Sequence, residues 1–131
     1  MPRIGLTRDK VIRTAAKLAN ERGLSAVTIT TLAEYLGIKK PSLYNHVKSQ
    51  EDIYYGIMVY GWTEGAQAIV DEIKEDAPYE ALKAYARKFY DYAINNKGIF
   101  EAMLWYNKYD NDELMQATEK IYKFFFNRLT K

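Results

Sequence analysis

The sequence contains no cysteine at all. This absence excludes disulfide bonds and thiolate metal sites, and it fits a reducing compartment, so we expect a cytoplasmic protein. With a single histidine and no cysteine to complete a zinc site, we expect neither a metal nor a cofactor. No apolar run approaches the roughly 18 residues that a membrane-spanning helix needs, and the first ten residues lack the apolar segment of a secretory signal. We therefore expect no membrane association.

Proline is also scarce, with Pro2, Pro41 and Pro78 the three in the chain, and no segment alternates apolar and polar residues as an exposed strand would. The sequence therefore predicts an all-α fold. Asp52 lies three residues after the expected helix cap Ser49, which is the spacing of a capping box. Caps, glycines and apolar stripes predict seven helices: from Thr7 to Gly23, from Thr28 or Thr30 to Gly37, from Lys40 through Val47, from 50 to about 75, from 78 to about 96 with a break at Lys97–Gly98, from 99 to 106, and from 113 onward.

Acidic residues are few in the first part of the chain. Residues 1–50 hold nine Lys or Arg and three Asp or Glu, whereas residues 51–131 hold ten Lys or Arg and fourteen Asp or Glu. Aromatic residues follow the opposite trend, because only Tyr35 and Tyr44 precede residue 51 and seventeen follow it. A basic first part attracts a polyanion, although small domains also vary by a few charges. We interpret the chain as a basic head followed by an acidic, aromatic-rich body.

Groups that carry out catalysis are missing from the sequence. It has no glycine-rich phosphate-binding loop, no cysteine nucleophile and no pair of carboxylates on one buried face. An acidic cluster near the expected end of the fourth helix is interpreted as a solvated rim; its members are Asp71, Glu72, Glu75 and Asp76. We therefore predict that the protein is not an enzyme.

The most informative segment is residues 28–48, TITTLAEYLGIKKPSLYNHVK. Gly37 permits the positive φ of a tight turn between two helices, and Leu43 and Val47, four residues apart, form the inward side of the second helix. This layout is typical of a helix-turn-helix, whose second helix enters the major groove of duplex DNA. The first helix has one apolar face made by Ile29, Leu32, Ala33 and Leu36.

The side chains expected to point outward from the second helix suit duplex DNA. Lys39 and Lys40 can reach phosphates or guanine O6 and N7, and Asn45 can form two hydrogen bonds with adenine. The Tyr44 hydroxyl can donate to a phosphate, and Lys48 is placed for the sugar–phosphate backbone. Phosphate contacts would set the register of the protein on DNA, and base contacts would give specificity.

The run LGIKKPSLYNHVKSQEDI resembles the TetR family of bacterial transcriptional repressors. The resemblance covers residues about 5 to 65, roughly half of the chain. Ile29 and Thr30 depart from it, because some members have a polar and a basic residue at these positions. The matching elements are Leu36-Gly37-Ile38, the run from Leu43 to Lys48, the helix start from Ser49 to Ile53, and upstream Thr28, Leu32, Ala33 and residues 15–23.

The resemblance implies a homodimeric repressor with two domains. Residues 5–65 would be the DNA-binding domain, with the helix-turn-helix at about 28–47, and residues 66–131 would be a helical domain for ligand binding and dimerisation. Because family members continue through further helices, the resemblance implies a chain that is either truncated or partly ordered in the body. The family contacts and the side-chain chemistry together predict DNA binding by Thr28, Thr30, Lys39, Lys40, Pro41, Ser42, Tyr44, Asn45, His46 and Lys48.

The aromatic residues of the body are candidates for a binding site for a small apolar or aromatic effector, because such pockets are apolar with few polar groups. The alternative for each of them is a place in the helical core. The last helix is strongly apolar at Phe124 and Phe125, which need a cover from a further helix, from a second subunit or from the predicted fifth helix. The effector-site candidates are Trp62, Tyr85, Phe89, Tyr92, Phe100, Met103 and Trp105.

Two functional hypotheses follow. In the first, the protein represses transcription from a palindromic operator, and an effector tilts the fourth helix so that the two recognition helices of a dimer leave their spacing of about 34–36 Å. In the alternative, the same DNA-binding fold acts constitutively or through a protein partner, with no small-molecule effector.

Overall fold

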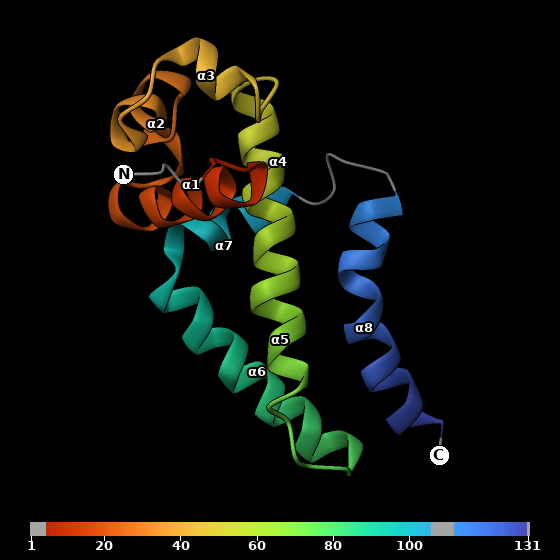
Figure 1. Ribbon diagram of the computed structural model, residues 1–131. Helices are drawn as coiled ribbons and strands as arrows, with labels where there is room; N and C mark the ends of the chain where they lie inside the picture. Colours follow the sequence, from red (N-terminus) through yellow and green to blue (C-terminus); the bar gives the residue numbers. More distant parts are fainter. Residues whose placement is uncertain (1–4, 106–111, 131) are drawn as a thin grey trace.

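The computed structural model describes residues 5–105 and 112–130, which form helices joined by short turns (Figure 1). These residues contain no strand, which confirms the predicted all-α fold. None of the helices among them is long and apolar enough to cross a bilayer. In chain order the elements are α1 (Arg8–Arg22), η1 (Leu24–Ala26), α2 (Ile29–Leu36), α3 (Lys40–Tyr44), α4 (Gln50–Tyr60), η2 (Gly61–Gln67), α5 (Ala68–Val70), α6 (Pro78–Asn95), α7 (Lys97–Met103) and α8 (Asp112–Leu129).

The first two helices of the head begin and end at the predicted residues. The Thr7 hydroxyl accepts a hydrogen bond from the Lys10 N–H at 3.2 Å, and Gly23 ends α1 with a φ of 91°. Of the two candidates for the cap of α2, Thr28 is the one observed, in a reciprocal pair with Thr31. Each cap satisfies N–H groups that the first helical turn leaves without partners.

One hydrophobic core joins the head to the body. It includes Val11 and Leu18 of α1, Leu43 of α3, and Met103 of α7, all at most 1% exposed. In Figure 1, α1 crosses between the helix-turn-helix and α7. The predicted division of the chain between residues 65 and 66 falls within this core and stays a prediction.

The long fourth helix differs from the prediction of one regular helix to about residue 75. Helical structure ends at Val70, and its middle part, η2, is a π-helix. The two glycines of this part each lie under a body side chain. A Cβ atom added to Gly61 would lie 2.5 Å from the Met103 Cγ, and one added to Gly65 would lie 2.4 Å from the Tyr92 Cζ. Glycine tolerates both the close approach and the wider helical turn.

The break after α6 also differs from the prediction. Lys97 and Gly98 were predicted to interrupt the helix, but they form the first turn of α7, and the chain turns at Asn96 instead. Asn20 of α1 explains this start, because its Oδ1 accepts the Ile99 N–H at 3.0 Å and its Nδ2 donates to the Asn96 Oδ1 at 3.0 Å. A side chain from another helix thus caps α7. Residue 106, the predicted end of this helix, lies outside the described residues.

The last helix, α8, begins at Asp112, one residue before the predicted start, and packs along η2 (Figure 1). The Phe125 ring meets the Tyr85 ring of α6 edge-on, with centroids 5.3 Å apart. Phe124 packs against the small cluster that contains Ile69 and Ile73. The helix α6 therefore covers these phenylalanines in part, which is one of the three possibilities considered from the sequence.

Candidate nucleic-acid interface

The recognition helix α3 is held by a glycine turn on one side and by two buried anchors on the other. Gly37 has a φ of 70°, in the left-handed region, and the Ile38 N–H donates to the Ala33 carbonyl oxygen at 3.0 Å. Leu43 and Val47 are 0% and 1% exposed. The prediction of the helix itself was too long, because α3 ends at Tyr44 and Val47 lies in the following segment, although it still points inward.

Most predicted DNA contacts on and around α3 are exposed. Tyr44 is 52% exposed even though it neighbours the buried Leu43, and His46 is only partly buried. The side chains of Lys39, Lys40 and Lys48 form no ion pair with any described residue. The exposed set is Thr30, Lys39, Lys40, Pro41, Ser42, Tyr44, Asn45 and Lys48.

The arginines of α1 differ from these lysines. The Arg13 guanidinium bonds to Asp9 at 2.8 Å and to Glu64 at 2.7 Å. The hydrogen bond to Asp9 is the main reason that the pKa of Arg13 is raised above its ordinary value. Neighbouring carboxylates therefore offset its charge, as Asp52 does for Arg8. The lysines at α3 form no ion pair with a described residue, which makes them the stronger candidates for phosphate contacts.

A hollow of about 660 Å³ lies where α3 leads into α4. It brings Tyr44, Asn45, His46 and Lys48 of the predicted DNA contacts into one wall. Apart from Val47, the remaining residues of the wall come from α1, α4 and α8, and two of them, Asp52 and Glu113, are acidic. The Tyr55 hydroxyl of α4 donates to the Glu113 Oε2 at 2.6 Å, which connects this region to the body.

Thr28 and Thr30 lie at the start of α2, as predicted. The Thr28 hydroxyl accepts the Thr31 N–H at 3.0 Å and lies 2.9 Å from the Thr31 hydroxyl, which in turn donates to the Ala26 carbonyl oxygen at 2.6 Å. In this arrangement the Thr28 hydroxyl hydrogen is used within the cap. To donate to a phosphate, the Thr28 hydroxyl would therefore have to give up its hydrogen bond to the Thr31 hydroxyl.

The sequence prediction missed Arg8, and it assigned Asp52 only to a helix cap. The Asp52 N–H does donate to the Ser49 Oγ at 3.1 Å, but its carboxylate accepts from the Lys48 N–H and from Arg8 instead of closing the capping box. Partial burial alone would raise the pKa of Asp52, but the hydrogen bonds from Arg8 and Lys48 outweigh it, so the pKa is lowered. Its position at the third residue of α4 was the one local signal available.

Five of the seven effector-site candidates form one aromatic cluster or lie beside it. The Phe89 ring is the centre of this cluster, with centroids 5.9 Å from Phe100, 6.0 Å from Tyr85 and 6.4 Å from Trp62. Tyr92 contacts the same cores as Phe89. Burial raises the pKa of Tyr85 and Tyr92 to about 12.

The other two candidates, Met103 and Trp105, belong to the main core or pack against it. Met103 is 1% exposed in the main core, where it lies against Gly61. Trp105 packs edge-on against Tyr54 of α4, with ring centroids 5.2 Å apart. The alternative of a core position therefore describes Met103 better than a place in a pocket wall.

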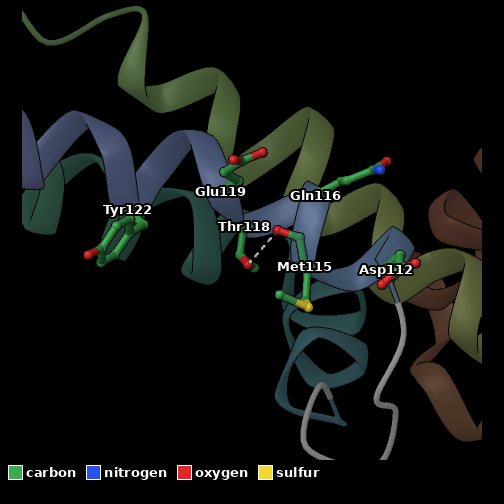
Figure 2. A pocket seen from close by; sticks show the side chains of 6 residues that line it. All are labelled: Asp112, Met115, Gln116, Thr118, Glu119 and Tyr122. Atoms are coloured by element: carbon green, nitrogen blue, oxygen red, sulfur yellow. Dashed lines mark hydrogen bonds between the residues drawn. The ribbon is translucent and has the colours of Figure 1, made fainter.

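Surface pockets among the described residues of the body include one on α6 and α7 and one on α8. An apolar pocket of about 520 Å³ opens between α6 and α7, and its wall includes Phe89 and Phe100 together with Ala93, Ile94 and Lys97. A second pocket, of about 470 Å³, is lined only by α8, and Figure 2 shows its six side chains standing along that helix. The second pocket contains none of the predicted effector residues. Its wall is Asp112, Met115, Gln116, Thr118, Glu119 and Tyr122.

The head is similar in sequence to a recognised group of proteins. The family model described as "Bacterial regulatory proteins, tetR family" matches residues 11–55. An uncharacterized HTH-type transcriptional regulator, YobS of Bacillus subtilis, is 33% identical over 103 residues, which are 79% of this chain and 54% of that protein. The class D tetracycline repressor protein of Escherichia coli is 41% identical over 54 residues, which are 41% of this chain and 25% of the repressor.

A solved structure has a similar arrangement of helices. The TetR family transcriptional regulator PfmR from Thermus thermophilus superposes with a TM-score of 0.66 at 26% identity, over 93% of this chain and 69% of that one. The chain spans about half of the length of YobS and a quarter of that of the tetracycline repressor. The similarity to these two relatives is thus a similarity to part of each protein.

Proposed function

Since the chain carries the helix-turn-helix head of the TetR family, we propose that it is a sequence-specific DNA-binding regulator of transcription in the cytoplasm. In this proposal two copies bind a palindromic operator, with their recognition helices in successive major grooves about 34–36 Å apart. The protein acts as a repressor, and a small apolar or aromatic effector releases it from the operator.

One observation carries this proposal. The helix α3 buries Leu43 and presents Tyr44 beside it at 52% exposure, with Lys39, Lys40 and Lys48 around it unpaired among the described residues. An exposed phenol and unpaired cations around a rigidly anchored short helix suit the phosphates and base edges of a major groove.

The test begins with duplexes that the purified protein selects from a random library. Replacing both Tyr44 and Lys48 with alanine is expected to weaken binding to every duplex and to reduce its salt dependence, because phosphate contacts release counterions. The matched control is Lys74→Ala, which removes an exposed lysine of the body and should leave affinity unchanged. Unchanged affinity in the double variant would contradict the proposal.

Asn45 tests the base contacts separately. Replacing Asn45 with alanine is expected to relax the preference at one base pair, at a cost of about 1–3 kcal/mol for the selected sequence. Affinity for unrelated duplexes should stay the same, because this side chain carries no charge for phosphate. A uniform loss on all duplexes would assign Asn45 to the backbone instead.

The apolar pocket between α6 and α7 supports the effector part of the proposal, because Phe89 and Phe100 belong to both its wall and the aromatic cluster. Compounds that raise the melting temperature are expected to lower operator affinity. Replacing Ala93 with phenylalanine fills this pocket and should abolish both effects, whereas Met115→Phe, in the pocket of Figure 2, should not.

The alternative is a regulator that acts constitutively or through a protein partner. It is favoured if no apolar or aromatic compound changes either the melting temperature or operator affinity. DNA binding by α3 is common to both hypotheses, so this outcome would leave the first part of the proposal in place.

A further inference from the structure

An arginine at the start of α1 connects three elements of the head. The Arg8 guanidinium forms two parallel hydrogen bonds with the Asp52 carboxylate, from Nη1 to Oδ2 at 2.8 Å and from Nη2 to Oδ1 at 3.0 Å. Its Nη1 also donates to the His46 carbonyl oxygen at 3.1 Å. The Asp52 Oδ2 accepts the Lys48 N–H at 2.8 Å. The pair thus connects α1, the segment that leaves α3, and the first turn of α4.

The bonds to His46 and Lys48 are made to the backbone. They therefore fix the path of the chain out of the recognition helix, whatever side chains these two residues carry. The helix α3 has only five residues, too few to set its own orientation through internal hydrogen bonds. Its angle to α4 depends on the buried Leu43 and Val47 and on this connection.

The geometry of the pair suits a rigid connection. Two parallel N–H···O bonds between a guanidinium and a carboxylate fix both distance and orientation, and charged hydrogen bonds are about twice as strong as neutral ones. The Asp52 side chain is 18% exposed, which reduces screening by solvent. The Arg8 side chain is more open, at 43%.

We propose that Arg8 and Asp52 are positioning residues for DNA recognition, which hold α3 at the angle to α4 that presents Tyr44, Asn45 and Lys48 to the groove. This inference rests on the proposed DNA-binding function. Neither residue reads a base. A change in the direction of α4 at its first turn is transmitted to the recognition helix through this pair.

Direct phosphate binding by Arg8 is the competing explanation. Its two terminal nitrogens already bond to Asp52 and His46, and Asp52 offsets its charge. Lys39 and Lys40 have no such acidic partner among the described residues. The geometry therefore favours a role inside the protein for Arg8 over a contact with DNA.

The substitution Asp52→Asn distinguishes an electrostatic effect from a positioning effect by the sign of the change in duplex affinity. It removes a negative charge near the DNA-binding surface, so electrostatics alone would tighten binding to a polyanion. Loss of a positioning bond would instead weaken binding to the selected duplex, by about tenfold for one charged hydrogen bond. We expect weaker binding to the selected duplex and little change on unrelated duplexes.

The pair of Arg13 and Glu64 provides a matched control. It also starts from α1, has an N–O distance of 2.7 Å and has an arginine side chain of similar exposure, at 45%, although its carboxylate side chain is more open, at 49%. It leads to η2, and no printed bond of either side chain reaches a described backbone group near α3. Glu64→Gln removes the same charge as Asp52→Asn. We expect it to leave duplex affinity unchanged or slightly tighter. Equal weakening by both variants would overturn the proposal, because any loosening of α1 would then suffice.

Arg8→Gln tests the competing explanation through salt dependence. A positioning role predicts weaker binding with an unchanged slope of log affinity against log salt concentration. A phosphate contact predicts a slope reduced by about 0.9. The second result would overturn the positioning role of Arg8, and so would unchanged or tighter duplex binding by a folded Asp52→Asn variant.

Hydrogen exchange of the free protein keeps this inference separate from the proposed function. If the connection holds the segment after α3, the Lys48 amide should exchange faster in Asp52→Asn and at the original rate in Glu64→Gln. If the wild-type protein selects no duplex, the proposed function fails, and the positioning role fails with it. Unchanged exchange at Lys48 in Asp52→Asn, with selected DNA still bound, would overturn only the role of the pair.

Discussion

Replacing Gly98 with alanine is expected to push the body away from the head. Gly98 is buried in the first turn of α7, against the last turns of α1. A Cβ atom at this position would lie 2.1 Å from the Ala19 carbonyl oxygen and 2.7 Å from the Asn20 backbone nitrogen. Both are backbone atoms of a helix, so no side-chain rotation relieves the overlap and α7 must move.

Opposing effects set the magnitude. Alanine favours a helix over glycine by about 1 kcal/mol. Overpacking typically costs about 1–3 kcal/mol, and contacts this short with backbone place the cost at the upper end. Moving α7 also breaks the 3.0 Å bond from the Ile99 N–H to the Asn20 Oδ1, which contributes about 1 kcal/mol. The net loss in the free energy of unfolding is therefore about 3 kcal/mol.

Urea unfolding followed by far-ultraviolet circular dichroism measures this loss. The midpoint should fall for Gly98→Ala, and the melting temperature should fall by about 10 °C for a domain of this size. Gly5→Ala is the control, because no atom lies within 4 Å of a Cβ placed there. Its effect should stay within about 0.5 kcal/mol. An unchanged midpoint for Gly98→Ala would refute the close packing of α7 on α1.

Three further predictions concern stability. Thr28→Ala removes the cap of α2 and should cost about 1 kcal/mol in urea unfolding, whereas Ser25→Ala, at an exposed position nearby, should cost little. The lowered pKa of Asp52 means that its contribution is present above the ordinary value of 3.8 and is lost as pH falls through the lower folded value, so wild type should lose more stability in acid than Asp52→Asn. The pKa values of Tyr85 and Tyr92 are raised to about 12, so both phenols stabilise the folded state below pH 10. This stabilisation should be lost as pH rises from 10 to about 12. An absorbance titration at alkaline pH should find these two phenols ionising last, and a Tyr85→Phe variant should lose one late step.

Local signals predicted the head well. Thr7, Gly23, Thr28 and Gly37 each act within a few residues of the helix that they begin or end, so their effects can be read from neighbouring letters of the sequence. The alternation of buried and exposed positions around Leu43 likewise depends only on helical periodicity. For the same reason the lysines and the tyrosine of α3 could be assigned to the outward face before the structure was known.

Two of the errors occurred where distant residues meet. The start of α7 depends on Asn20, which bonds to a residue 79 positions away. The π-helical part of the fourth helix depends on contacts of Gly61 and Gly65 with side chains of α7 and α6. Neither partner leaves a periodic trace in the sequence, so a regular helix was the expectation.

By itself the sequence determined the all-α fold and predicted the helix-turn-helix of the head, because caps, glycine turns and apolar spacing act over one or two helical turns. Only the tertiary structure decided how that head is held. Arg8 and Asp52 are 44 residues apart, and they meet because α1 and α4 pack around one shared core. The effector candidates were separated in the same way: packing placed Phe89 and Phe100 at a pocket wall and Met103 in the core.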